Sequence, residues 1–93
     1  MIDSFADKRA AAIWRGELPK GFPVQIAQTV RRKLRMIHAA QNVQDLRAPP
    51  GNRLEALQGD RAGQYSIRVN AQFRICFIWR DGKAHQVEIV DYH

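Results

Sequence analysis

Two arginines and a polar chain end are the groups in this sequence best suited to chemistry. Arg68 and Arg74 flank a short polar segment, and the chain closes on Tyr92 and His93. An arginine fork binds two phosphate oxygens at once, and an aromatic ring can stack a splayed base. With Glu55 added, the set resembles what RNA cleavage without a metal requires. That reaction needs a base for the ribose 2′-hydroxyl, cations for the pentavalent phosphorane, and an acid for the leaving 5′-oxygen.

The strands that must position these groups are visible as alternating apolar and polar residues over 64–69 and 73–79. A three-residue loop at 70–72 places Ile67 opposite Ile75 and keeps both apolar faces together, so we expect that register. The same register sets Arg68 opposite Arg74, and like charges directly across a strand pair repel. Either an acid lies between the two arginines, or an anion is their expected ligand, or both are solvated on an open sheet face.

A final strand is expected over residues 83–90, after the turn signal Asp81-Gly82. Matching of apolar faces favours a three-residue loop at 81–83, with a bulge, which pairs Phe77 with Val87 and Ile75 with Ile89. That pairing puts three residues on the face of the arginine pair: Glu88, Val90 and Tyr92. Asp91 and His93 start from the opposite face, although the free chain end can twist.

The first half of the chain reads as helical. A short strand at residues 2–5 precedes a helix that Asp7 caps and Gly16 ends. A second helix is expected over about residues 23–40, with an apolar face and a charged face. The apolar face comprises Ile26, Val30, Leu34 and Ile37, and the charged face comprises Arg31, Arg32, Lys33 and Arg35. The charged face is either solvated or lies along a nucleic acid or an acidic partner.

One more helical turn is expected over residues 43–47, and the prolines at 49–50 then end the helical half. Residues 52–57 read as a strand, which presents Glu55 on the outer face if Leu54 and Ala56 face the core. Neither half can bury its apolar face alone, so we expect a single domain over residues 1–93. The expected fold class is α+β, with two N-terminal helices packed on a small twisted, mainly antiparallel sheet.

Charge and composition limit the partners and cofactors that this protein is expected to have. The 93 residues carry a net charge of +6, and most of the fifteen basic residues are arginines. This balance suggests nucleic acid, an anionic membrane or an acidic protein as partner, and no long apolar run supports the membrane. The single cysteine, Cys76, excludes an internal disulfide and indicates a cytoplasmic protein. We expect neither a metal nor another cofactor, because the three histidines are far apart and no Cys/His cluster or glycine-rich phosphate loop occurs.

Five segments resemble the HigB toxin family of the wider RelE/ParE superfamily, and the chain is most similar to its GraT-like branch. They are PPGNRLEAL at 49–57, GDRAG at 59–63, SIRVN at 66–70, FRICF at 73–77 and VDYH at 90–93. The similarity covers nearly the whole chain, and its most specific part is the terminal Asp91-Tyr92-His93. The resemblance implies a RelE-like fold and a ribosome-dependent messenger-RNA endonuclease. It also implies a HigA-like helix-turn-helix antitoxin as partner, through which alone operator DNA is bound.

The resemblance also assigns roles to single residues. It carries the strand arginine onto Arg74, the aromatic onto Tyr92, and the terminal acidic and imidazole groups onto Asp91 and His93. In some members a histidine stands at the position of Glu55 and a lysine at that of Gln58, so Glu55 is either the base or a counter-ion of the arginines. Three further arginines are expected to position RNA: Arg53, Arg61 and Arg68. The alternative function is a non-catalytic basic toxin that blocks the ribosome or gyrase by binding.

Overall fold

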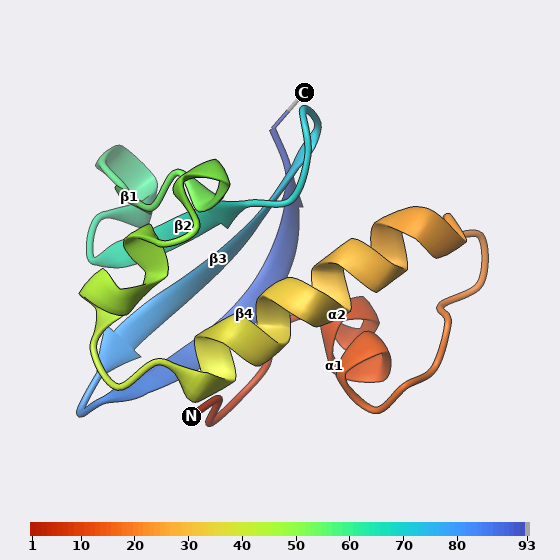
Figure 1. Ribbon diagram of the computed structural model, residues 1–93, viewed down its shortest axis with the longest axis horizontal. Helices are drawn as coiled ribbons and strands as arrows, with labels where there is room; N and C mark the ends of the chain where they lie inside the picture. Colours follow the sequence, from red (N-terminus) through yellow and green to blue (C-terminus); the bar gives the residue numbers. More distant parts are fainter. Residues whose placement is uncertain (93) are drawn as a thin grey trace.

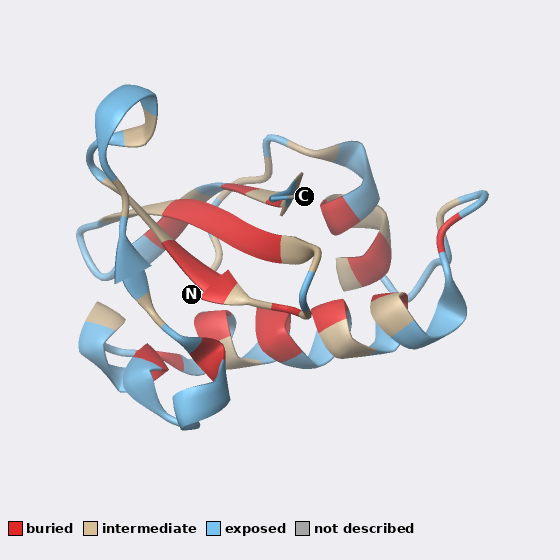
Figure 2. Cartoon of the chain, turned by 90° about the horizontal axis from the view of Figure 1, so that it is seen from above, coloured by how far each residue is buried: buried red, intermediate tan, exposed pale blue. Residues whose placement is uncertain are grey.

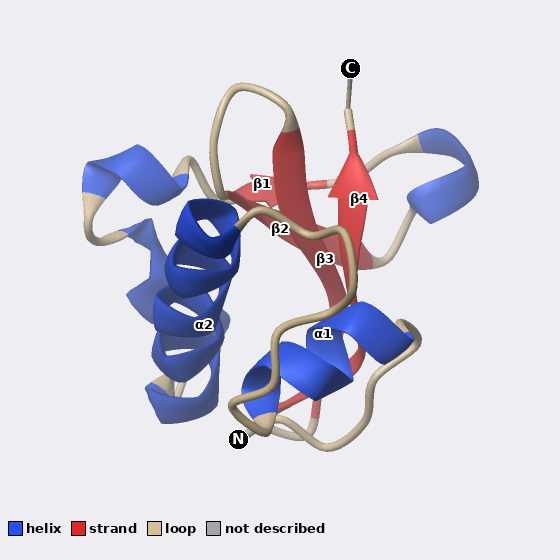
Figure 3. Ribbon diagram, turned by 90° about the vertical axis from the view of Figure 1, so that its right-hand side faces the viewer, coloured by secondary structure: helices blue, strands red, loops and turns tan. Residues whose placement is uncertain are grey.

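Two helices cover one face of a four-stranded antiparallel sheet in the computed structural model, which describes residues 1–92 (Figures 1 and 3). The helices are α1 (Lys8–Trp14) and α2 (Val24–Ala39). The strands β1 (Glu55–Ala56), β2 (Gln64–Arg68), β3 (Phe73–Arg80) and β4 (Lys83–Asp91) lie side by side in chain order. The described part of the chain also contains three short 3-10 helices: η1 (Val43–Arg47), η2 (Pro50–Asn52) and η3 (Gly59–Arg61). The predicted α+β fold is therefore confirmed.

Asp7 fixes the start of α1 and joins it to the sheet. One carboxylate oxygen, Oδ1, accepts from the backbone N–H of Arg9 at 2.8 Å, as an N-cap does. The other, Oδ2, accepts from the backbone N–H of Ile89 in β4 at 2.9 Å. The predicted cap is confirmed, and the single carboxylate also satisfies a strand amide that no neighbouring strand reaches.

We expect Asp7→Ala to lower the free energy of unfolding by about 2–3 kcal/mol, because it removes a cap and leaves the Ile89 amide without its acceptor. Urea denaturation measures the loss. Asp60→Ala is the matched control, since Asp60 is exposed and should change stability by less than about 0.5 kcal/mol. Equal stabilities for the two variants would show that the Asp7 bonds are not formed.

Helix α2 turns one face to the sheet and the other to solvent, as its pattern predicts. Its buried residues include Val30, Leu34 and Ile37, while Arg31, Arg32 and Arg35 are exposed (Figure 2). Lys33 departs from the expected charged face: only 8% of this residue is exposed. It lies toward η2, where its Nζ donates to the Oδ1 of Asn52.

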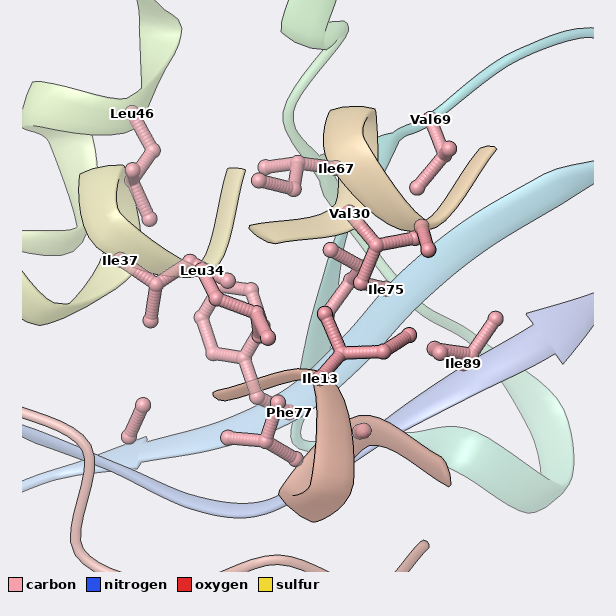
Figure 4. Close-up of a cluster of buried hydrophobic side chains, with 14 of the residues drawn as sticks. Ile13, Val30, Leu34, Ile37, Leu46, Ile67, Val69, Ile75, Phe77 and Ile89 are labelled. Atoms are coloured by element: carbon pink, nitrogen blue, oxygen red, sulfur yellow. The ribbon is translucent and has the colours of Figure 1, made fainter. Parts of the chain in front are cut away.

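The core lies between the helices and the inner sheet face (Figure 4). Phe77 is fully buried at its centre, stacked on Tyr65 and in edge contact with Trp79. Strand β3 is the most enclosed strand, because residues 74–77 are all buried. Arg74 lies near the start of β3 and faces away from this core. It is nevertheless buried, as are the three residues that follow it.

The pairing of β2 with β3 confirms the predicted register. Ile67 lies opposite Ile75 and Arg68 opposite Arg74, around the predicted three-residue loop at 70–72. Asn70 closes that loop, since its Oδ1 accepts from the backbone N–H groups of Gln72 and Phe73. The unfavourable arginine pair is thus a real feature of the fold.

The loop between β3 and β4 differs from the predicted three-residue loop at 81–83, so that prediction is wrong. Arg80 pairs with Lys83, so the loop has two residues, Asp81 and Gly82, both at positive φ. The register shifts later, between Cys76 and Ile78. On the facing strand, Gln86 has φ +52° and its N–H donates to the Oγ of Ser4. The bulge therefore lies where the N-terminal segment docks, and beyond it Ile75 pairs with Ile89 as predicted.

The segment before β2 is less regular than the predicted strand over 52–57. Residues Pro50–Asn52 form η2, Ala56 is exposed, and only Glu55 and Ala56 join the sheet. The cause is Asn52, whose side chain is fully buried and fixes a turn there. The expected strand at residues 2–5 is reduced to two isolated parallel bridges to β4, at Ile2 and Phe5. Within residues 1–92 no helix is both long and apolar enough to cross a membrane.

Candidate active site

The outer sheet face carries a group of polar residues on neighbouring strands. Glu55 of β1 lies opposite Ser66 of β2, Ser66 lies opposite Cys76 of β3, and Cys76 lies opposite Glu88 of β4. Because alternate residues share a face, Arg68 and Arg74 belong to the same surface. This surface faces away from the helices and the core.

Arg74 is the centre of this group, and its guanidinium is almost enclosed. The side chain is only 10% exposed. Its Nε donates to the Oγ of Ser66 at 2.7 Å, and its Nη2 donates to the backbone oxygens of Arg53 at 2.6 Å and Ser66 at 3.3 Å. The remaining nitrogen, Nη1, lies 3.9 Å from the Oε1 of Glu55. Two of its three nitrogens are therefore held by the protein, which fixes the direction of the third.

Tyr92 covers the other side of that guanidinium. The centre of its ring lies 5.9 Å from the Cζ of Arg74, within cation–π range. Its hydroxyl lies 3.8 Å from the Sγ of Cys76. Burial, and then the contact with Cys76, raise the pKa of Tyr92 above its ordinary value, so the phenol stays neutral at physiological pH. Tyr92 nevertheless exposes 46% of its surface, which leaves part of the ring free to meet a base.

An ion pair closes one side of the site. The Nη1 of Arg61, in η3, donates to the Oε2 of Glu88 at 3.3 Å and to the Oε1 of Gln64 at 3.0 Å. The hydrogen bond with Glu88 raises the pKa of Arg61. Arg61 thus lies beside the site as expected, although Glu88 balances part of its charge.

The other predicted residues divide into those at the site and those beside it. Arg53 reaches Arg74 with its backbone oxygen, while the residue itself is exposed. Arg68 is half-buried, and its side chain makes no hydrogen bond or ion pair with another described residue. Asp91 lies opposite Phe73, and its Oδ2 accepts from the Nε2 of Gln72. His93 lies outside the described residues.

Sequence reasoning missed Ser66 and Cys76 as parts of the site. Both are fully buried, although they lie on the outer face. The alternation around Ile67 and Ile75 did place them on that face, so this signal was available. What it could not show is that Ser66 would hold the Nε of Arg74, or that Cys76 would contact Tyr92.

Solved structures of other proteins share the overall fold of this chain. Among solved structures, a mutant of YafQ from E. coli superimposes with a TM-score of 0.66 at 9% identity, covering 99% of this chain and 94% of that one. The YoeB–YefM complex from Staphylococcus aureus contains a chain that matches with a TM-score of 0.60 at 16% identity, covering 100% of this chain and 98% of that one. These similarities show the fold, which this chain shares with YafQ and with the matching chain of the YoeB–YefM complex.

Sequence comparison gives the family. The model of the RelE-like toxin HigB of type II toxin–antitoxin systems matches residues 3–93. Endoribonuclease HigB of Proteus vulgaris is 32% identical over the full length of both chains. Toxin HigB-1 of Vibrio cholerae is 52% identical over 62 residues, which span 67% of this chain and 65% of that protein. The chain therefore belongs to the HigB-like toxin family, while its place in the GraT-like branch stays a prediction.

Proposed function

We propose that this toxin is an endoribonuclease that cuts messenger RNA on the ribosome. The observation that carries the proposal is the enclosed guanidinium of Arg74, whose one outward nitrogen meets Glu55 beside the ring of Tyr92. A cation fixed in this way can stabilise charge as it develops on a phosphate, without reorganising. The naming of the full-length relative from Proteus vulgaris as an endoribonuclease supports the same activity.

The proposed reaction is attack by the ribose 2′-oxygen on the adjacent phosphorus. Glu55 takes the 2′-hydroxyl proton, the new 2′-O–P bond forms, and Arg74 stabilises the phosphorane. The P–O5′ bond then breaks, and His93 gives its proton to the leaving 5′-oxygen. Asp91, in the terminal segment that resembles the HigB family, is proposed as a further catalytic group. The products are a 2′,3′-cyclic phosphate and a 5′-hydroxyl, and the protein groups alone supply the acid and the base.

Tyr92 and three arginines are proposed to hold the message. The part-exposed ring of Tyr92 stacks a base next to the scissile phosphate. Arg53, Arg61 and Arg68 contact phosphates along the strand. Glu88 already balances part of the charge of Arg61. Arg68 is the best placed of the three, because no carboxylate within residues 1–92 pairs with it and it lies directly opposite Arg74. A phosphate between Arg68 and Arg74 would also relieve their repulsion.

We expect Arg68→Ala to weaken binding of the ribosome–message complex and to lower its salt dependence. Loss of one phosphate contact should reduce the slope of log K against log salt by about 0.7–0.9. The mutation should not lower stability, since it removes a like-charge pair. Binding titrations at several salt concentrations measure the slope, with Arg47→Ala on η1 as the control. An unchanged slope would exclude Arg68 from the RNA path.

The proposed partners follow from the family. Toxins of type II systems are restrained by an antitoxin, and we propose a HigA-like helix-turn-helix protein in that role, with operator DNA bound only through it. The ribosome and its message are the proposed target, which makes the cytoplasm the compartment where this protein acts.

Ribosome dependence is tested by comparing free RNA with the same message on translating ribosomes. We expect rapid cutting of the ribosome-bound message and slow cutting of free RNA, because the only described candidate base is 56% exposed and weakly held. Rapid cleavage of naked RNA at low enzyme concentration would contradict the ribosome requirement. Growth arrest without new messenger 5′ ends would instead support a non-catalytic toxin acting on the ribosome or gyrase.

A further inference from the structure

A buried asparagine organises the segment that leads into the proposed active site. We call residues 48–55 the strap, because they connect the helical half to β1. Asn52 is fully buried within it. Its Nδ2 donates to the backbone oxygens of Leu46 at 3.2 Å and Ala48 at 3.3 Å, and its Oδ1 accepts from the Nζ of Lys33. The side-chain amide therefore joins α2, η1 and the strap, and both its polar atoms are used.

The strap then turns sharply and delivers two groups to Arg74. Backbone bonds from Asn52 to Pro49 and from Arg53 to Pro50 close the turn, and Arg53 takes a left-handed conformation with φ +46°. Non-glycine residues adopt this conformation only where the surroundings hold them. The carbonyl of Arg53 accepts from the Nη2 of Arg74 at 2.6 Å. Two residues later, the carboxylate of Glu55 meets Nη1 of the same guanidinium.

Lys33 completes this network, although burial disfavours its positive charge. Its ammonium lies on the buried face of α2, and within residues 1–92 it forms no ion pair with a carboxylate. Burial, and then repulsion from Arg32 and Arg68, lower the pKa of Lys33. An apolar side chain would avoid both effects. What the ammonium supplies is a directional bond to Asn52, and hence a fixed position for the strap.

We propose that Lys33 and Asn52 are positioning residues for RNA cleavage, which hold the strap so that Arg53 and Glu55 meet Arg74. This inference rests on the proposed function, since it acts through Arg74 and Glu55. It assigns a role in the reaction to two buried residues that lie outside the proposed catalytic group. Displacement of a catalytic group by about 1 Å can slow a reaction about 100-fold, so loosening the strap should affect turnover more than binding.

The test uses Asn52→Ala and the isosteric Asn52→Asp, which keeps a partner for Lys33 but cannot donate to Leu46 and Ala48. We expect either variant to lower the single-turnover cleavage rate about 10–100-fold, with message binding changed less than about threefold. Val30→Ala, in the core part of α2, is the stability control. It should lower the melting temperature without lowering the rate per folded molecule. A rate per folded molecule that Asn52→Asp leaves unchanged would overturn the proposal.

A double-mutant cycle separates this proposal from the proposed function. If Asn52 acts through Arg74, then Asn52→Asp should slow an Arg74→Ala protein by less than about threefold, whereas independent effects would multiply. Wild-type cleavage by Arg74→Ala alone would contradict the proposed active site instead. In that case the strap is tested by NMR, which measures the exchange rate of the Arg74 Nη2 protons. Faster exchange in Asn52→Asp supports the proposal that the strap holds Arg74, and unchanged exchange overturns it.

Discussion

Arg74→Ala is expected to lower the single-turnover rate of message cleavage about 100- to 1,000-fold, the usual effect of removing a fixed donor to developing negative charge. Growth arrest on expression should be lost with it. The same change should lower the free energy of unfolding by about 2–4 kcal/mol, because it leaves the buried Ser66 hydroxyl and the backbone carbonyls of Ser66 and Arg53 without this donor. Urea denaturation and quantitative product analysis measure the two effects separately.

Two further variants make this prediction specific. Arg80→Ala removes the same side chain from the exposed end of the same strand, so both rate and stability should stay close to wild type. Arg74→Lys keeps the charge but not the fork, and it should recover less than about tenfold of the lost rate, since one ammonium cannot hold Ser66, Arg53 and a phosphate together. Full cleavage by a stably folded Arg74→Ala protein would remove Arg74 from the mechanism.

Glu55→Gln is expected to lower the cleavage rate about 100- to 10,000-fold if Glu55 is the base, which is the usual contribution of a positioned proton acceptor. The counter-ion role predicts a much smaller effect. Glu55 is 56% exposed and its Oε1 lies 3.9 Å from the arginine, so the pair is worth at most about 1 kcal/mol, or about fivefold. The size of the loss therefore decides between the two roles that the sequence leaves open.

The control for this change is Glu17→Gln. Glu17 is paired with Arg15 at the surface of the helical layer, so its loss should leave the rate unchanged. Thermal unfolding of both variants should stay within about 1 kcal/mol of wild type. A rate loss below tenfold for Glu55→Gln would assign the carboxylate to the counter-ion role and move the base to another group.

The site could be predicted from sequence where one strong local rule applied. Consistent burial of Ile67 and Ile75 fixes the β2–β3 register, and that register alone places Arg68 opposite Arg74. The same rule carried Tyr92 to the correct face, because Ile75 pairs with Ile89 beyond the bulge. Alternation therefore predicted the part of the site that lies on regular strands.

The parts that could not be predicted depend on contacts between distant residues. The bulge at Gln86 forms where Ser4 docks, 82 positions away, so the face rule wrongly moved the extra residue into the loop. Lys33 read as part of a charged helix face, because nothing local shows that Asn52 lies beneath it. Asn52 itself was predicted to lie in a strand. The local sequence does not show that its amide is buried, because that burial depends on α2 and η1 packing around it.

Attack of a 2′-oxygen on the phosphorus beside Arg74 leaves a characteristic pair of cut ends, so the chemistry of those ends distinguishes this mechanism from others. Purified toxin is added to translating ribosomes with a labelled message, and the fragments are analysed at both ends. We predict a 2′,3′-cyclic phosphate on the upstream fragment and a 5′-hydroxyl on the downstream one, both absent with Arg74→Ala. A 3′-hydroxyl facing a 5′-phosphate would exclude this mechanism, because attack by water, not by the 2′-oxygen, produces those ends.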